Sequence, residues 1–213
     1  MEAHIWPLYG LRITTPHLEL RLPDLEQLSE LAAVAAAGVH DENWMPFSRP
    51  WTDASPADRG RSTFQHLLGS VAAWTPQDWT LSLAVRCEGT IVGRQDLGAT
   101  DFAVTGEAQT GSWLGRVHQG RGIGTEMRAA VLHLAFEGLG ARYLTSSAMT
   151  DNARSLRVSE KLGYRPDGLT VVSVRGTART QRRLRLDREG WAAHRTVPVE
   201  LHGLEPSLAL FGL

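Results

Sequence analysis

Alternating apolar and polar positions predict the strands of this chain. Leu18, Leu20 and Leu22 alternate with Glu19 and Arg21, a period of two that is typical of a strand with one buried face. Glu88-Gly89 and Gly176 are placed as hairpin turns between such segments. Gly115, inside an expected strand, indicates a bulge or a close backbone approach. The strands expected in this way cover residues 12–22, 80–86, 90–97, 109–117, 143–147, 171–174 and 180–186.

Apolar residues spaced three and four apart predict the helices. The first follows a capping box formed by Asp24 and Gln27 and ends at Gly38. The second starts at Ser55-Pro56, with Ser as the cap and Pro in the first turn. Its expected apolar face consists of Phe64, Leu67, Leu68 and Val71. Three more helices are expected at residues 122–137, 153–162 and 187–194.

The order of these elements predicts the fold class. A strand, two helices, three strands, a helix, a strand, a helix and two strands indicate an α+β domain. We expect a central mixed, twisted sheet of about six to seven strands with helices on both faces. Residues 1–195 are expected to form one domain, and the apolar tail 196–213 to pack on that domain or on a partner subunit. The tail and the Trp-rich loops also favour a homo-oligomer.

Composition and charge exclude several classes of protein. Hydrophobic residues make up 42% and charged residues 21% of the chain, which is ordinary globular usage. No apolar run approaches the roughly 20 residues that span a bilayer, so we expect no membrane protein. Residues 1–4 do not resemble a secretory signal, and Cys87 is the only cysteine, so we expect a cytoplasmic location and no internal disulfide. The eight histidines form no metal-binding motif, so no metal is expected.

The arginine and lysine residues are distributed unevenly along the chain. The net charge of −1 argues against a dedicated nucleic-acid-binding protein. Fifteen of the 22 cations nevertheless follow residue 106, and only Lys161 is not an arginine. A local basic surface for a phosphate-bearing ligand is therefore possible in the second half of the chain.

A glycine-rich segment lies between an expected strand and an expected helix. Gly120, Gly122 and Gly124 let the backbone approach a ligand without Cβ interference. The free N–H groups and the dipole at a helix N-terminus favour an anion such as phosphate. The spacing does not match the dinucleotide-binding pattern, and no Lys precedes Thr125 as a Walker loop would require.

Two motifs together resemble those of one enzyme superfamily. Gln119-x-x-Gly122-x-Gly124 is similar to the pyrophosphate loop of the GNAT acyl-CoA N-acyltransferases. Residues 152–164, with an Asn, a helix and a closing Gly-Tyr, are similar to that superfamily's second signature. Residues 11–21 resemble the start of its ribosomal-protein N-terminal acetyltransferase branch. Residues 38–41, 45–52 and 111–115 resemble an actinobacterial subgroup described as GNAT succinyltransferases.

This resemblance implies a GNAT fold over roughly residues 11–195 and direct attack of an amine on the thioester of acetyl-CoA or succinyl-CoA. The acceptor amine would be a peptide N-terminus, a lysine or a small molecule. Backbone groups of Trp113 and Leu114 would bind the pantetheine arm and polarise the thioester carbonyl. Asn152 would bind the pantetheine as well, although an Asn here is also a good helix cap. The pyrophosphate would lie on the loop Gln119, Gly120, Arg121, Gly122, Ile123 and Gly124.

The resemblance also implies a proton donor. Ser155 lies one helical turn after Asn152, where the ribosomal-protein branch has a serine that is proposed to protonate the leaving thiolate. Many members of the wider superfamily carry a Tyr seven residues after the Asn, and this chain has Ser159 there. Either Ser155 or water would therefore supply the proton.

Residues that bind the acceptor are the least determined by the sequence. We predict His40, Asp41, Met45, Phe47 and Gln95 as substrate-binding residues. The loop of residues 40–51 would either line a pocket or pack under the second helix. By residue type alone, the candidates for the general base are Glu107, Asp96, Asp41, His40 and Glu126. Arg49 and Arg94 are formal candidates for binding the extra carboxylate of a succinyl group.

Two other classes of function remain open. The absence of a Tyr at position 159 is compatible with a sensor that binds acyl-CoA without catalysis. An interaction protein built on a degraded enzyme fold would bind no CoA ester, and the intact glycine loop argues against it.

Overall fold

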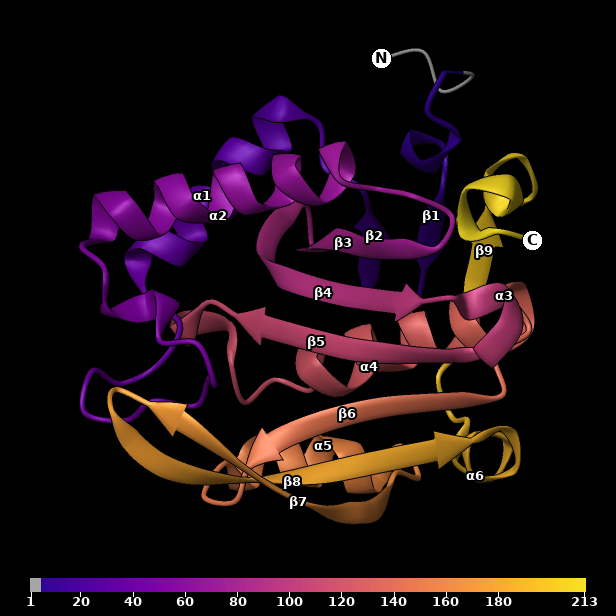
Figure 1. Ribbon diagram of the computed structural model, residues 1–213. Helices are drawn as coiled ribbons and strands as arrows, with labels where there is room; N and C mark the ends of the chain where they lie inside the picture. Colours follow the sequence, from indigo (N-terminus) through magenta and orange to yellow (C-terminus); the bar gives the residue numbers. More distant parts are fainter. Residues whose placement is uncertain (1–4) are drawn as a thin grey trace.

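The computed structural model describes residues 5–213, so the expectation for residues 1–4 lies outside the described part. Within residues 5–213, nine strands form one sheet in the order β7-β8-β6-β5-β4-β3-β2-β1-β9 (Figure 1). The strands are β1 (Arg12–Thr14), β2 (Leu18–Arg21), β3 (Asp78–Cys87), β4 (Thr90–Thr100), β5 (Glu107–Leu114), β6 (Tyr143–Met149), β7 (Arg165–Val174), β8 (Thr177–Asp187) and β9 (Glu200–His202). The mixed α+β fold class is confirmed, with more strands than expected.

Helices cover both faces of the sheet. The helices are α1 (Leu25–Ala37), α2 (Pro56–Ala72), α3 (Phe102–Thr105), α4 (Ile123–His133), α5 (Ala153–Lys161) and α6 (Arg188–His194). Leu28 and Leu31 of α1 pack with Trp113 of β5 on one face, whereas Leu114 packs with Met127 of α4 on the other. Successive residues of a strand point to opposite faces, so β5 separates the two helical layers.

The predicted helix boundaries agree closely with the structure. The capping box at Asp24 and Gln27 is present, and Ser55 caps α2 through the N–H of Asp58. The helix expected at residues 122–137 is α4, which continues as a π-helical turn at Leu134–Gly138. Leu68, which we expected on the apolar face of α2, is instead 40% exposed.

The strand expected at residues 12–22 is a hairpin of two strands. Ile13 pairs with Leu20, and Thr15 N–H donates to Leu18 O at 3.0 Å across the turn. Pro16 lies inside that turn, where its missing N–H removes no ladder bond. This split and the addition of β9 account for the larger number of strands.

The strand expected at residues 109–117 begins earlier and ends at Leu114. Gly115 follows it, and a Cβ at this glycine would lie 2.7 Å from Val34 Cγ1. A close approach to α1, rather than a bulge, therefore explains this glycine.

The last residues of the chain pack on the first strands. β9 runs antiparallel to β1, with Leu201 opposite Ile13. Phe211 is fully buried, and its ring lies 4.9 Å from that of Trp79. Trp74 Nε1 donates to Leu210 O at 2.7 Å. No helix within residues 5–213 is long and apolar enough to cross a bilayer.

Truncation of Phe211 should therefore be costly. We expect Phe211→Ala to lower the free energy of unfolding by about 3–5 kcal/mol, because it removes a buried aromatic ring and leaves a cavity. Urea denaturation measures this loss. The control Leu213→Ala, at a side chain that is 49% exposed, should change stability by less than about 0.5 kcal/mol. Equal effects of the two substitutions would contradict this role of Phe211.

Candidate active site

The sheet opens between β5 and β6, two neighbouring strands in its interior. β5 and β6 are parallel, and they pair only from Glu107 opposite Tyr143 to Gln109 opposite Thr145. Beyond this point β5 stays paired with β4 as far as Leu114, and β6 stays paired with β8 as far as Met149. The two strands therefore diverge toward their C-terminal ends (Figure 1).

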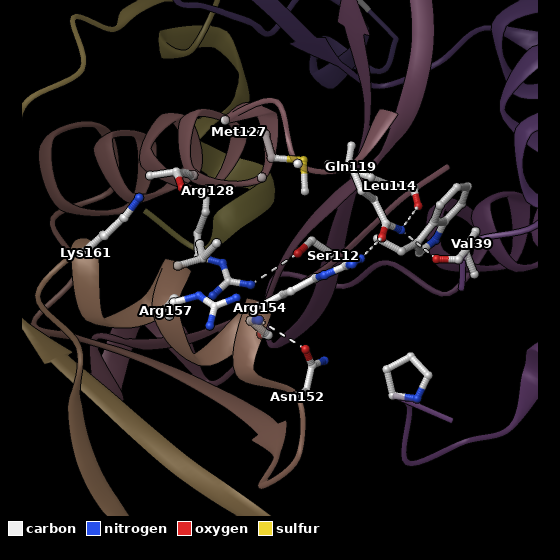
Figure 2. A pocket seen from close by; sticks show the side chains of 18 of the residues that line it. Val39, Ser112, Leu114, Gln119, Met127, Arg128, Asn152, Arg154, Arg157 and Lys161 are labelled. Atoms are coloured by element: carbon white, nitrogen blue, oxygen red, sulfur yellow. Dashed lines mark hydrogen bonds between the residues drawn. The ribbon is translucent and has the colours of Figure 1, made fainter. Parts of the chain in front are cut away.

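A cavity of about 470 Å³ lies at this opening. Its wall combines the end of β5, the glycine loop, the first turns of α4, helix α5 and part of the segment 39–47. Nine of the predicted site residues line it: Phe47, Trp113, Leu114, Gln119, Gly120, Gly122, Gly124, Asn152 and Ser155. The structure thus brings the two sequence motifs together around one cavity (Figure 2).

The glycine loop leaves the N-terminus of α4 open to this cavity. Gly120 and Gly122 have φ values of 78° and 83°, a left-handed conformation that favours glycine. Gly122 is the N-cap of α4 and carries no capping side chain. Thr125 N–H donates to Gly122 O at 3.0 Å, so the N–H groups of Ile123 and Gly124 are the ones in this turn that remain available to an anion.

Gln119 holds the loop in place. Its Nε2 donates to Val39 O at 2.7 Å and to Leu114 O at 3.0 Å, and its Oε1 accepts from Arg154 at 3.0 Å (Figure 2). The side chain thus ties the loop to the end of β5 and to helix α5. This shapes the cavity without using the Gln119 side chain as a ligand.

The lining of the cavity is strongly basic. Arg128, Arg154, Arg157 and Lys161 line it, and no Asp or Glu is among the described lining residues. None of these four positions was predicted as a site residue from the sequence. Arg154, Arg157 and Lys161 recur at intervals of three and four along α5, so helical spacing could have identified them as one face.

Arg128 is the most buried of these cations, with 6% of the residue exposed. Its Nη1 donates to Ser159 Oγ at 2.8 Å. Its Nη2 donates to Ser112 Oγ at 3.3 Å (Figure 2). Burial lowers the pKa of Arg128, but a guanidinium keeps its charge at neutral pH. The wall of the cavity therefore contains a buried positive charge.

Asn152 and Ser155 lie at the start of α5. Asn152 Oδ1 accepts from the backbone N–H of Ser155 at 3.1 Å, so the side chain caps the helix. Its amide nitrogen is the atom that a ligand could use. Ser155 is half-buried and lines the cavity.

Two residues of the predicted pyrophosphate loop lie elsewhere. Arg121 is exposed and does not line the cavity. Ile123 is 4% exposed and packs in the main core, so only its backbone can face a ligand.

The predicted substrate-binding residues are divided among four places, one of which is the main cavity with Phe47. His40 and Asp41 line an adjoining cavity of about 460 Å³, where Asp41 pairs with Arg116 at 3.3 Å. Met45 is 2% exposed and packs with Met149 and Val174. Gln95 is fully buried and donates to Gly111 O at 2.8 Å. Phe47 lines the main cavity, and Phe47 and Trp51 pack in the cluster that contains Leu67 of α2, whereas Met45 packs against β6 and β7.

None of the five candidate bases lines the main cavity. Glu126 accepts from Thr15 Oγ1 at 2.6 Å and thereby anchors the β1–β2 turn. Asp96 and Glu107 line a different cavity of about 890 Å³, together with Arg49 and Arg94. There Asp96 forms an ion pair with Arg94 at 2.9 Å.

The remaining reactive side chains are spread out. Within residues 5–213, no three His, Cys, Asp or Glu side chains gather as a metal site would require. Burial raises the pKa of the Cys87 thiol, which makes it a poor nucleophile.

Comparison with known proteins identifies the family. Residues 17–165 match the family described as "Acetyltransferase (GNAT) domain". The chain belongs to this family. The matched residues include the β5–β6 opening, the glycine loop and the two helices α4 and α5 that line the cavity.

Solved structures of other acetyltransferases share this fold. Mycobacterium smegmatis RimJ in complex with CoA-disulfide is 19% identical, with a TM-score of 0.68 over 96% of this chain and 95% of that one. RimL, a ribosomal L7/L12 alpha-N-protein acetyltransferase in complex with coenzyme A, is 18% identical, with a TM-score of 0.66 over 83% and 97%. A GCN5-related N-acetyltransferase from Brucella melitensis is 22% identical, with a TM-score of 0.65 over 86% and 81%.

Proposed function

We propose that this protein is an N-acyltransferase that moves an acetyl or succinyl group from CoA to a primary amine. The observation that carries the proposal is the cavity itself. A helix N-terminus with free N–H groups, two diverging strands and a wall with cations but no carboxylates meet at one place. A polyanionic thioester suits such a site.

Each part of the cavity wall has a separate role in this proposal. The loop N–H groups from Gly120 to Gly124 bind the pyrophosphate, and Arg154, Arg157 and Lys161 add charge for the phosphates. Trp113 and Leu114 lie where β5 has no β6 partner. Leu114 O is already held by Gln119 Nε2, so the remaining backbone groups at this edge are the ones that can bind the pantetheine arm. A backbone N–H at this edge would polarise the thioester carbonyl.

The acceptor would enter from the side of the segment 39–47. Trp44, Pro46 and Phe47 line the cavity and supply apolar contacts. His40 and Asp41 in the adjoining cavity would contact a longer acceptor, such as a peptide N-terminus. Because no carboxylate lines the main cavity, water would take up the proton that the amine loses.

The test is release of free thiol from acetyl-CoA or succinyl-CoA when the purified protein meets peptide, lysine and small amines. Mass spectrometry of the amine would identify the transferred group. Thiol release that depends on both substrates supports the proposal. Tight binding of CoA esters without any turnover would instead show the sensor function. Absence of binding would reject both.

Ser155→Ala should slow the reaction without weakening binding. If the Ser155 hydroxyl protonates the leaving thiolate, its removal lowers kcat by about 10²-fold, the lower end of general acid catalysis. Steady-state kinetics measure kcat and KM separately. The control Ser62→Ala removes an exposed serine of α2 and should change neither constant. An unchanged kcat in Ser155→Ala would assign the proton to water.

A further inference from the structure

Arg128 is a buried cation without a countercharge. It lies on α4 with 6% of the residue exposed, and its two hydrogen-bond partners, Ser112 and Ser159, are neutral hydroxyls. Its Nε has no partner at all. Within residues 5–213, Tyr164 is the only ionisable neighbour that affects its pKa, and no carboxylate lines the cavity.

A buried guanidinium without a carboxylate partner lowers the stability of the ligand-free protein. Moving a charge out of water costs several kcal/mol unless an opposite charge or a full set of hydrogen bonds compensates it. Two serine hydroxyls satisfy only part of a guanidinium with five N–H donors. A negative charge inside the cavity would relieve this deficit.

The position of the guanidinium indicates where that charge would be. Ser112 belongs to the part of β5 that has no β6 partner. Ser159 lies one turn after Ser155 on α5, and its Oγ donates to Ser155 O at 3.1 Å. Arg128 therefore bridges β5 and α5 across the opening, one helical turn from Ser155.

This position differs from that of the phosphates. Arg128 follows Gly122 by six residues, which is roughly 9 Å along a helix. Arg154 and Arg157 on α5 are exposed, so their side chains can bind phosphates at the solvent-facing end of the cavity. Arg128, in contrast, is held inside the cavity wall by its hydrogen bonds to Ser112 and Ser159. A ligand group that meets Arg128 would therefore be other than the phosphates.

We propose that Arg128 is a catalytic residue that stabilises the negative charge on the departing CoA sulfur. The inference rests on the proposed acyltransferase function. The amine nitrogen forms a bond to the thioester carbon, and the C–S bond breaks with its electron pair remaining on sulfur. Water takes the proton from nitrogen. The guanidinium binds the thiolate by a charge-assisted hydrogen bond until Ser155 or water protonates it.

Ser159 is a positioning residue in this arrangement. It is fully buried, and its small side chain leaves room for the guanidinium that donates to it. The Tyr that many GNAT enzymes carry seven residues after the Asn would fill this space. In this chain the positive charge of Arg128 therefore assists the departure of sulfur, and Ser155 or water supplies the proton.

The direct test is the thiol pKa of bound CoA, followed by the ultraviolet absorbance of the thiolate during a pH titration. We expect wild-type protein to lower this pKa by at least about one unit relative to free CoA. Arg128→Gln should abolish the shift and lower kcat by about 10²-fold, while the Kd for CoA stays within about threefold. Arg128→Lys, which keeps the charge, should retain part of both effects.

Two further variants separate catalysis from folding. Ser159→Ala removes the hydrogen bond of 2.8 Å from Arg128 Nη1 to Ser159 Oγ. Like Arg128→Gln, it should raise the thiol pKa of bound CoA relative to wild type, but by a smaller amount. Arg59→Gln is the matched control, because Arg59 also bridges two segments, through Ala36 O and Thr52 O, but outside the main cavity. Arg59→Gln should leave the thiol pKa of bound CoA unchanged.

Three results would overturn the inference. The first is a thiol pKa of bound CoA that is the same in wild type and in folded Arg128→Gln and Arg128→Lys. The second is an Arg128→Gln variant that loses activity with succinyl-CoA but keeps its activity with acetyl-CoA. That result would show that the guanidinium binds the carboxylate of the succinyl group. In both of these cases thiol release by wild type would still support the acyltransferase function. The third is failure of wild type to bind CoA, which would reject the proposed function as well.

Discussion

Gly122→Glu should abolish the stabilisation of this protein by CoA. A ligand at about 100 times its Kd adds about 2.7 kcal/mol to stability, which for a domain of this size raises Tm by roughly 5–11 °C. Wild-type protein should show this rise with CoA, acetyl-CoA or succinyl-CoA. The variant should show none.

The geometry of Gly122 explains why binding is lost while the fold is kept. A Cβ at Gly122 would meet nothing within 4 Å, so a side chain at this position projects into the cavity. The glutamate carboxylate would take the place of the pyrophosphate at the N-terminus of α4, where the helix dipole favours an anion. The cost to the fold is about 1–2 kcal/mol, from a non-glycine residue in the left-handed region.

Gly140→Glu provides the matched control. Gly140 has a similar φ of 73°, and a Cβ there would also meet nothing within 4 Å, but it does not line the cavity. This variant should lose similar intrinsic stability and keep the full rise in Tm with CoA. If Gly122→Glu showed the same rise in Tm with CoA as wild type, CoA would bind somewhere other than on the glycine loop.

Gly93→Ala should have the second large effect, on both stability and binding. Gly93 of β4 pairs with Leu114 of β5, and a Cβ there would lie 2.3 Å from Trp113 O and 2.9 Å from Leu114 Cα. Real Cβ atoms do not approach backbone this closely, so the two strands must separate. We expect a loss of about 3 kcal/mol or more, at the upper end for overpacking.

The same displacement should impair the cavity. Trp113 and Leu114 line it and lead into the glycine loop, so a shift of this strand end should weaken CoA binding by at least about tenfold. Thermal unfolding and calorimetric titration measure the two effects. Gly98→Ala, on the same strand, is the control, because its Cβ would approach only to 3.0 Å from Thr80 Oγ1 and lies outside the cavity. A Gly93→Ala variant as stable as Gly98→Ala would disprove the contact.

The sequence predicted the elements whose signals are local. The capping box at Asp24, the Ser55 cap and the glycine turns are each encoded within a few residues, and the structure has all of them. β9 was missed because its three residues form a strand only by pairing with β1. Likewise, α3 is a four-residue helix that follows Asp101 in a left-handed conformation, and no periodicity signals it.

The residues of the candidate site also divide into those with a local sequence signal, which were predicted, and those without one, which were missed. The glycine loop was found because its chemistry is contiguous in the sequence. The basic lining was missed because Arg128 and the α5 cations become neighbours only when α4 and α5 pack on one side of β5. The candidate bases were chosen by residue type, and Glu126 shows the weakness of that choice, since its carboxylate holds the β1–β2 turn.

The pairing of β9 with β1 has a consequence for biosynthesis. Thr14 and His202, whose side chains hydrogen-bond at 3.3 Å, are 188 positions apart in the sequence, so most of this sequence must be synthesised before the contact can form. Until then the outer edge of β1 has unpaired backbone groups that could pair with another nascent chain. Domains with such distant pairings fold slowly, because the closure of a long loop precedes any gain from the contact. The vulnerable period for this protein is therefore its synthesis, and it ends when the last strand pairs with the first.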